Sequence, residues 1–232
     1  MCSLLHLMKC EYCDQICIRK GFVRSVQRFY CKNCKRYQQS SYTYTRCSIN
    51  DDCLIVKLNN EGMSGSSISR ITGISKTHVM NKIRMLADTT NMVMTNECGQ
   101  EYEVDELRTF VGNKKNECWV MYAINKTTKQ VIDFAVGRRT KENIRKVIDT
   151  LNKLHPKRIF SDQLNIYSSL IDRSIHSTRG YGINHIERMN LNLRKDIKCL
   201  NRKTICYAKS EMMLEARLNL YFFGKERMPV GA

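Results

Sequence analysis

The order of hydrophobic and polar positions divides the chain into three zones. Residues 1–46 are rich in cysteine and aromatic side chains, residues 47–90 have apolar positions at helical spacing, and residues from 99 onward mix strand-like and helical runs. Apolar residues three and four apart predict amphipathic helices, whereas strict alternation predicts strands. The pattern predicts a multi-domain protein with domains at 1–46, 47–98 and 99–232.

The second zone predicts three short helices. The second of these begins at Ser64 or Ser66, both good N-cap residues, and directs Ile68 and Ile71 inward. A glycine-containing turn then leads into a third helix over residues 76–88. Its inward positions are Val79, Ile83 and Leu86, and its outward polar and basic positions are Lys76, Thr77, His78, Asn81, Lys82 and Arg84.

A short helix, a tight turn and a basic second helix are typical of the helix-turn-helix, whose second helix enters the major groove of DNA. In that interpretation the outward residues of the helix over 76–88 bind DNA. A plain three-helix packing module has the same apolar pattern, so the DNA interpretation depends on the outward residues alone.

The third zone alternates strands and helices, which predicts an α/β domain with a mixed sheet. An extended segment opens it and places Glu101, Glu103 and Asp105 on one face. The remaining predicted elements are two strands divided by a turn at 125–129, a helix over 141–155 capped by Thr140, a short strand ending at Asp162, a small helical or irregular stretch, and a final helix over 185–198.

The net charge of the chain indicates which class of molecule it binds. Thirty-nine Lys and Arg against 22 Asp and Glu give the chain a formal net charge of +17, spread along its length. Such a charge suits a polyanion, with nucleic acid as the commonest, although a ribosomal or membrane-surface protein also fits. No apolar run approaches the roughly 20 residues of a membrane span, and the opening segment is too short and too rich in cysteine for a signal peptide. We therefore expect a cytoplasmic protein that does not enter a membrane.

Four of the twelve cysteines form two CxxC pairs, Cys10 with Cys13 and Cys31 with Cys34. Two thiolate pairs on tight turns can complete a tetrahedral zinc site, and a segment this short has little core without one. The spacing predicts a structural zinc ribbon over residues 1–46. A fifth cysteine nearby, Cys17, leaves some redox chemistry open as the alternative.

Three carboxylates in the third zone stand near the ends of predicted elements. Asp105 lies on the first strand, Asp162 follows a later strand, and Glu187 lies on the final helix. A crossover helix allows the first and fourth strands to lie side by side, so these acids can converge on hard, oxygen-liganded Mg²⁺ ions. In a chain this basic, acids placed opposite DNA are costly without metal between them.

Four segments of the third zone resemble the catalytic core of insertion-sequence-one transposases, which belong to the DDE group and have a ribonuclease H-like fold. They are VDELRTFVG, CWVMYAI, SDQLNIY and, most specific, NHIERMNLNLRK. That family also carries an N-terminal zinc ribbon and a helix-turn-helix, so the resemblance covers nearly the whole chain. One departure is Gln163, where the family often has glycine after the second aspartate.

The resemblance implies that Asp105, Asp162 and Glu187 form a catalytic triad that binds two Mg²⁺ or Mn²⁺ ions. It also implies that Arg188, Asn190, Asn192 and Arg194 approach DNA. Alternatives for each acid stay open, because Glu103 or Glu106 could replace Asp105, Asp172 could replace Asp162, and Glu187 could be a surface acid.

The implied activity is that of a prokaryotic, nucleoid-associated DNA transposase. Such a protein binds the terminal inverted repeats of its insertion sequence, cleaves strands to expose 3′-hydroxyls and transfers these to target DNA. Double-stranded DNA and further copies of the chain, at least a dimer on DNA, are the implied partners. The competing interpretation is a non-catalytic zinc-ribbon and helix-turn-helix regulator of transposition or transcription.

Overall fold

The computed structural model describes residues 8–41, 49–90, 98–178 and 182–224. The chain forms two compact units, Met1–Cys47 and Ser48–Ala232. Within the described residues, no helix is both long and apolar enough to cross a membrane.

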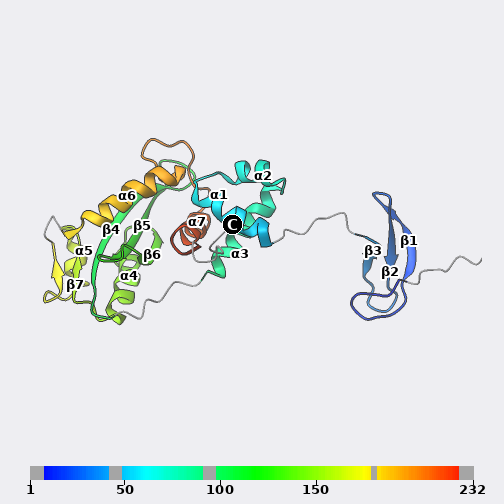
Figure 1. Cartoon of the computed structure of the whole chain (residues 1–232), viewed down its shortest axis with the longest axis horizontal. Coiled ribbons are helices and arrows are strands. Elements are labelled where there is room, and N and C mark those ends of the chain that lie inside the picture. The colour runs from blue at the N-terminus through cyan, green and yellow to red at the C-terminus, as the bar shows by residue number, and fades with distance from the viewer. Residues whose placement is uncertain (1–7, 42–48, 91–97, 179–181, 225–232) are drawn as a thin grey trace, which may run out of the picture. The chain divides into compact units, whose positions relative to one another are not determined.

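The first unit is a small three-stranded antiparallel sheet in the order β1, β2, β3, with bounds Ile18–Val23, Val26–Tyr30 and Tyr37–Gln39 (Figure 1). Arg24 and Ser25 join the first two strands with positive φ angles of 49° and 64°. Two consecutive left-handed residues match the twist of a tight hairpin. The unit's core consists of Cys10, Cys17, Phe29 and Cys31, so this sheet buries very little hydrocarbon.

The second unit begins with the three predicted helices, α1 (Ile49–Asn60), α2 (Gly65–Thr72) and α3 (Lys76–Asp88). Ser64 caps α2 by accepting the Ser67 N–H, which confirms one of the two predicted starts. The predicted inward residues of α3 are buried. Ile71 differs from the prediction, since 54% of its surface is exposed. The eight-residue helix α2 turns only its Gly65 and Ile68 side into the core.

A five-stranded mixed sheet follows, in the order β6-β5-β4-β7-β8. β4, β5 and β6 pair antiparallel, whereas β7 runs parallel to β4 and β8 parallel to β7. The strands span Glu101–Phe110, Glu117–Asn125, Val131–Gly137, Arg158–Phe160 and His176–Ser177. The predicted neighbourhood of the first and fourth strands is therefore confirmed, while β8 lies in a stretch predicted to be helical or irregular.

Helices cover both faces of this sheet (Figure 1). α4 (Lys141–Lys153), capped by Thr140 as predicted, packs on the face that carries Val104 and Met121. α6 (Asn184–Asp196) packs on the opposite face, with Leu107 and Tyr122. The short helices α5 and η2 span Asn165–Ser168 and Lys198–Leu200.

The last helix, α7 (Glu211–Phe223), was not predicted. Its sequence EMMLEARLNLYFF is apolar on several sides and lacks a single stripe. Leu214 and Leu218 join the core beneath α6, whereas Ala216 and Leu220 join the core of α1, α2 and α3. A helix that is apolar around much of its circumference is buried on more than one side, so α7 ties the three-helix module to the sheet.

Candidate metal centres and active site

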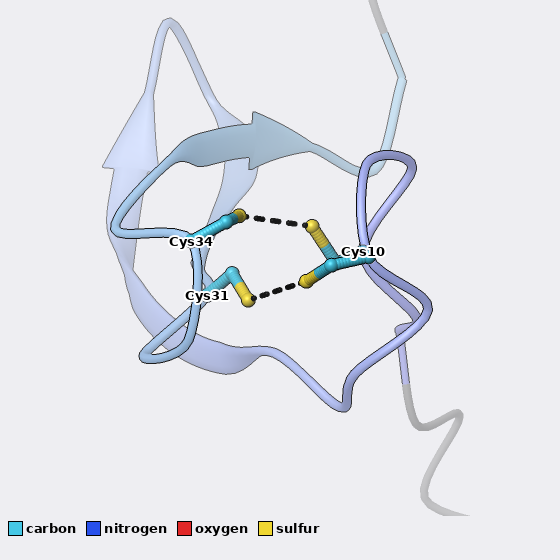
Figure 2. Close-up of side chains that lie close together, drawn as sticks. Cys10, Cys31 and Cys34 are labelled. Carbon is cyan, nitrogen blue, oxygen red and sulfur yellow. Dashed lines mark hydrogen bonds between the residues drawn. The ribbon is translucent and has the colours of Figure 1, made fainter.

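The four paired cysteines meet in the first unit. One ligand atom from each of Cys10, Cys13, Cys31 and Cys34 lies within 4.8 Å of all the others. The Sγ atoms of Cys10 and Cys34 are 3.4 Å apart and those of Cys13 and Cys31 are 3.5 Å apart, and Figure 2 shows thiols from the two turns facing one another. Four sulfurs bonded to one zinc at about 2.3 Å stand about 3.8 Å from each other, so this donor set fits zinc.

The turns also favour thiolates at two of these positions. A backbone hydrogen bond from Tyr12 lowers the pKa of Cys10, and one from Cys34 lowers the pKa of Cys31 to about 6. Burial raises the pKa of Cys34 to about 12, and its hydrogen bond with the Cys10 sulfur adds to the increase. Cys17 is buried beside the group but is not one of its four members, and burial raises its pKa to about 11.

In the second unit, Asp105 lies on β4 just beyond the segment that pairs with β7. That pairing covers only Glu101, Tyr102 and Glu103. Asp105 shares the face of Leu107, toward α6, and its Oδ1 accepts the backbone N–H of Glu106 at 2.8 Å. The carboxylate therefore lies on the part of β4 that extends past the end of its pairing with β7.

Asp162 follows the last residue of β7 by two positions, where parallel strands place ligand-binding loops. Its Oδ1 accepts the Leu164 N–H at 3.0 Å, which closes a small turn across Gln163. The alternative acid, Asp172, is exposed and accepts hydrogen bonds from the N–H and hydroxyl of Ser174. Asp172 is also outside the acidic cluster that the described residues form.

That cluster consists of Asp105, Glu106 and Asp162, which each offer a carboxylate oxygen within 4.8 Å of the other two. Burial raises the pKa of Asp105 to about 6, and the charges of Asp162 and Glu187 add to the increase. Burial likewise raises the pKa of Glu106 to about 7, although a hydrogen bond with Tyr167 opposes the shift. Clustered, desolvated carboxylates of this kind are typical of sites that bind a divalent cation.

Glu187 lies in the first turn of α6 with an exposed side chain. It is outside the cluster that closes within 4.8 Å, yet its charge is near enough to raise the pKa of Asp105. The predicted apolar stripe that anchors α6 is confirmed, since Ile186, Leu193 and Ile197 are buried and Met189 packs against them.

Asn190, expected to approach DNA, is occupied within the protein instead. Its Nδ2 donates to Asp105 Oδ2 at 2.6 Å, and its Oδ1 accepts from the Tyr122 hydroxyl at 2.8 Å. The same hydroxyl donates to the Ile186 carbonyl at 3.2 Å. These contacts do not support a DNA contact by Asn190, and they hold Oδ2 of Asp105.

The predicted DNA-contacting residues of α3 divide by exposure. Lys76, Thr77, Asn81 and Arg84 are exposed, and His78 is half-buried. Lys82 differs from the prediction, because its ammonium bonds Asp52 of α1 at 2.9 Å and only 17% of its side chain is exposed. An ion pair between helices is not readable from the pattern of one helix.

On α6, Arg188 is exposed and Asn192 is half-buried. The Nη1 of Arg194 donates to the Leu200 carbonyl at 2.9 Å, which fixes the guanidinium. Arg194 lines a cavity of about 390 Å³ together with Arg108 and Arg202, and the described residues that line it include no acid. Burial and the charge of Arg202 lower the pKa of Arg194. This cavity gathers three arginines beyond the acidic cluster along β4, and one of them, Arg108, pairs with Glu117.

Comparisons with known proteins agree with these observations. The family model described as IS1 transposase matches residues 99–226. The insertion element iso-IS1n protein InsB of Shigella dysenteriae is 37% identical over 108 residues, which are 47% of this chain and 82% of the relative. The insertion element IS1 4 protein InsB of Escherichia coli is 30% identical over 108 residues, 47% of this chain and 65% of that relative.

A comparison of folds finds a chain in a simian T-cell lymphotropic virus intasome bound to the PP2A regulatory subunit B56 gamma. The likeness covers 72% of this chain and 67% of the viral complex's chain, with 13% identity and a TM-score of 0.35.

Proposed function

Because this chain belongs to the IS1 transposase family, we propose that it binds the terminal inverted repeats of its insertion sequence, cleaves DNA strands there and joins the 3′-hydroxyls to target DNA. The observation that carries this proposal is the convergence of Asp105, on β4 just past its parallel pairing with β7, and Asp162, two residues after β7, with Glu187 on α6 near enough for its charge to act on Asp105. The strand order β6-β5-β4-β7-β8 with helices on both faces supports a ribonuclease H-like core.

Asp105, Asp162 and Glu187 would hold two Mg²⁺ or Mn²⁺ ions. The close approach of the Asp105 and Asp162 oxygens, and the raised pKa of Asp105, fit such cations. When bound, paired divalent ions polarise a phosphodiester and stabilise its attacking and leaving oxygens. The chain's own contribution is to keep the acids aimed, since Asn190 and the Glu106 N–H hold the two oxygens of Asp105. In the first unit, Cys10, Cys13, Cys31 and Cys34 would hold a structural zinc ion.

DNA binding is proposed for two surfaces. The exposed residues of α3, Lys76, Thr77, Asn81 and Arg84, suit a major groove in the manner of a helix-turn-helix. The arginines that line the cavity around Arg194 suit phosphates, which carry no sequence information. The protein would act on double-stranded DNA as a homo-oligomer, at least a dimer, in the nucleoid of a prokaryote.

The deciding experiment is a nicking assay on a duplex that carries an end of the encoding element. Full-length protein is incubated with this duplex and Mg²⁺ or Mn²⁺, and strand breaks are mapped on a denaturing gel. We expect metal-dependent nicks at the element boundary that disappear with Asp162→Asn. Specific binding without nicks in either metal would contradict the enzymatic proposal and favour the non-catalytic regulator.

A further inference from the structure

We propose that Glu103 is a positioning residue whose buried carboxylate fixes the first turn of α6 and thereby sets Glu187 against Asp105. This inference rests on the proposed function, because Glu187 matters only if the acids form one active site. It assigns a role to a residue that is neither in the acidic cluster nor exposed to DNA.

The contacts of Glu103 use both of its carboxylate oxygens. Oε1 lies 2.7 Å from His185 Nδ1, and Oε2 accepts the backbone N–H of Ile186 at 2.8 Å. The Glu103 side chain is 0% exposed. Burying a carboxylate is strongly unfavourable unless it is paired and hydrogen-bonded, so a fully enclosed acid at this position requires those two partners.

The helix lacks a cap of its own. Ile183 occupies the N-cap position of α6 and makes no side-chain capping bond. In most helices a Ser, Thr, Asp or Asn at that position accepts the N–H of the second or third helical residue. Glu103, from strand β4, accepts the N–H of Ile186, which is the third residue of α6. The negative carboxylate also complements the positive end of the helix dipole.

A cap supplied by another element does more than end a helix, because it ties α6 to β4. Glu103 and Asp105 lie two residues apart on the same face of that strand, and Ile186 precedes Glu187 directly. One turn later, Asn190 bonds Asp105 at 2.6 Å. The helix is therefore attached to β4 on both sides of Glu187, which prevents it from sliding or rotating over the acids.

Burial excludes Glu103 as a substitute for Asp105 in metal binding. Its side chain has no exposed surface, and it is not a member of the acidic cluster. Glu103 thus holds the helix that carries an acid, whereas Asp105 offers an oxygen to the acidic cluster.

The test compares Glu103→Gln with Glu101→Gln in the full-length protein. Glu101 lies on the same strand, but its carboxylate is 34% exposed and pairs with Lys126. Mn²⁺ binding is measured by electron paramagnetic resonance without DNA, and nicking is measured on the element-end duplex. We expect Glu103→Gln to weaken Mn²⁺ binding and slow nicking by about 10- to 100-fold, the usual effect of removing a group that orients a ligand, and Glu101→Gln to change neither.

A destabilised control separates positioning from general loss of stability. Val147 is a buried residue of α4, which packs on the opposite face of the sheet from α6. Val147→Ala should lower the unfolding temperature without changing Mn²⁺ affinity. If Glu103→Gln does not fold, His185→Ala replaces it. This variant removes one of the two contacts from a side chain that is 40% exposed, and we expect a smaller loss of Mn²⁺ affinity.

Equal Mn²⁺ affinities for Glu103→Gln and Glu101→Gln would overturn the inference, and so would a parallel loss of affinity in Val147→Ala. A wild-type protein that neither binds Mn²⁺ nor nicks DNA would overturn the proposed function, and this inference with it. A wild-type protein that does both, with an unchanged Glu103→Gln variant, would overturn the positioning role alone.

Discussion

The two candidate metal centres of this protein are built in opposite ways. The cysteine group of the first unit comes from two tight turns within one small sheet whose core is largely the cysteines themselves. The acidic cluster comes from β4 and the loop after β7, which are separated in sequence by β5, β6 and α4. Beneath it lie two hydrophobic cores, one on each face of the sheet.

This difference assigns a different role to the metal in each place. In the first unit there is too little buried hydrocarbon to stabilise a fold, so metal binding would contribute the folding free energy. In the second unit the cores hold carboxylates close together against their mutual repulsion, so the fold itself, without a cation, brings the acids together. Removing a ligand should therefore unfold the first unit and leave the second unit folded but inactive.

The largest expected effect is on the first unit. Cys10→Ser or Cys31→Ser should release zinc and unfold residues 8–41 completely, because a four-thiolate site with a missing ligand no longer offsets the chain entropy. Zinc content by elemental analysis and limited proteolysis measure this directly. If reduced wild-type protein contains no zinc after purification, the first unit does not depend on zinc and the contrast between the two centres is wrong.

The next effect is on cleavage. Asp105→Asn, Asp162→Asn and Glu187→Gln each remove an anionic oxygen while nearly preserving shape, and each should abolish nicking. Affinity for element-end DNA and the unfolding temperature should stay close to wild type, in contrast to the cysteine variants. Near-normal nicking by the Glu187→Gln protein would remove that residue from the active site.

The next smaller effect is expected on DNA binding, where variants of α3 and of Arg194 should behave differently. Asn81→Ala or Arg84→Ala should weaken binding to the element end relative to random DNA by about 1–3 kcal/mol, because Asn and Arg can pair with base edges. Arg194→Ala should lower the affinity for both DNAs by the same factor. It should also reduce the dependence of affinity on salt concentration, as expected for a phosphate contact. Filter-binding titrations over a range of salt concentrations distinguish the two patterns. Equal losses on both DNAs for the α3 variants would mean that another segment reads the sequence.

A smaller effect is expected for Glu106, the third member of the acidic cluster. Glu106→Gln should slow nicking by only about tenfold, the scale of a residue that tunes a neighbouring ligand, if Glu187 completes the site. Its Tyr167 hydrogen bond allows the amide to be accommodated. Single-turnover nicking rates for Glu106→Gln and Glu187→Gln, measured side by side, decide the question. A larger loss for Glu106→Gln would exchange the two assignments.

The smallest effect is a pH dependence of stability. Folding raises the pKa of Asp105 to about 6 and that of Glu106 to about 7. Between about pH 4 and about pH 7 the folded state therefore binds more protons than the unfolded state. The contribution of these groups to the free energy of unfolding falls as pH rises through this range. Added Mg²⁺ should raise the unfolding temperature more at about pH 8 than at about pH 5, where protons compete.

Calorimetry with and without added Mg²⁺ measures this dependence, and a variant with both Asp105→Asn and Glu106→Gln serves as the control. In the control the Mg²⁺ effect should be absent at both pH values. An equal Mg²⁺ effect at the two pH values in the wild-type protein would mean that the cluster is not where the cation binds.

Several local features of this protein were predictable because they depend on neighbours in sequence. The Thr140 cap of α4, the Ser64 cap of α2 and the apolar stripe of α6 follow from side chains three or four residues apart. α7 escaped prediction because it packs against two cores at once, which removes the single stripe that periodicity detects. Ile71, expected to be buried, is exposed because α2 is short and buries a narrow side.

The sequence by itself determined the spacing of the CxxC pairs, the basic charge and the elements that carry Asp105, Asp162 and Glu187. Only the tertiary structure decided how these acids relate to their neighbours. In the folded protein Glu106 belongs to the acidic cluster and Asn190 bonds Asp105. Lys82 pairs with Asp52, and Glu103 is buried against α6. The physical reason is that periodicity specifies which face of an element is apolar, whereas a polar contact depends on the register and angle at which two distant elements pack.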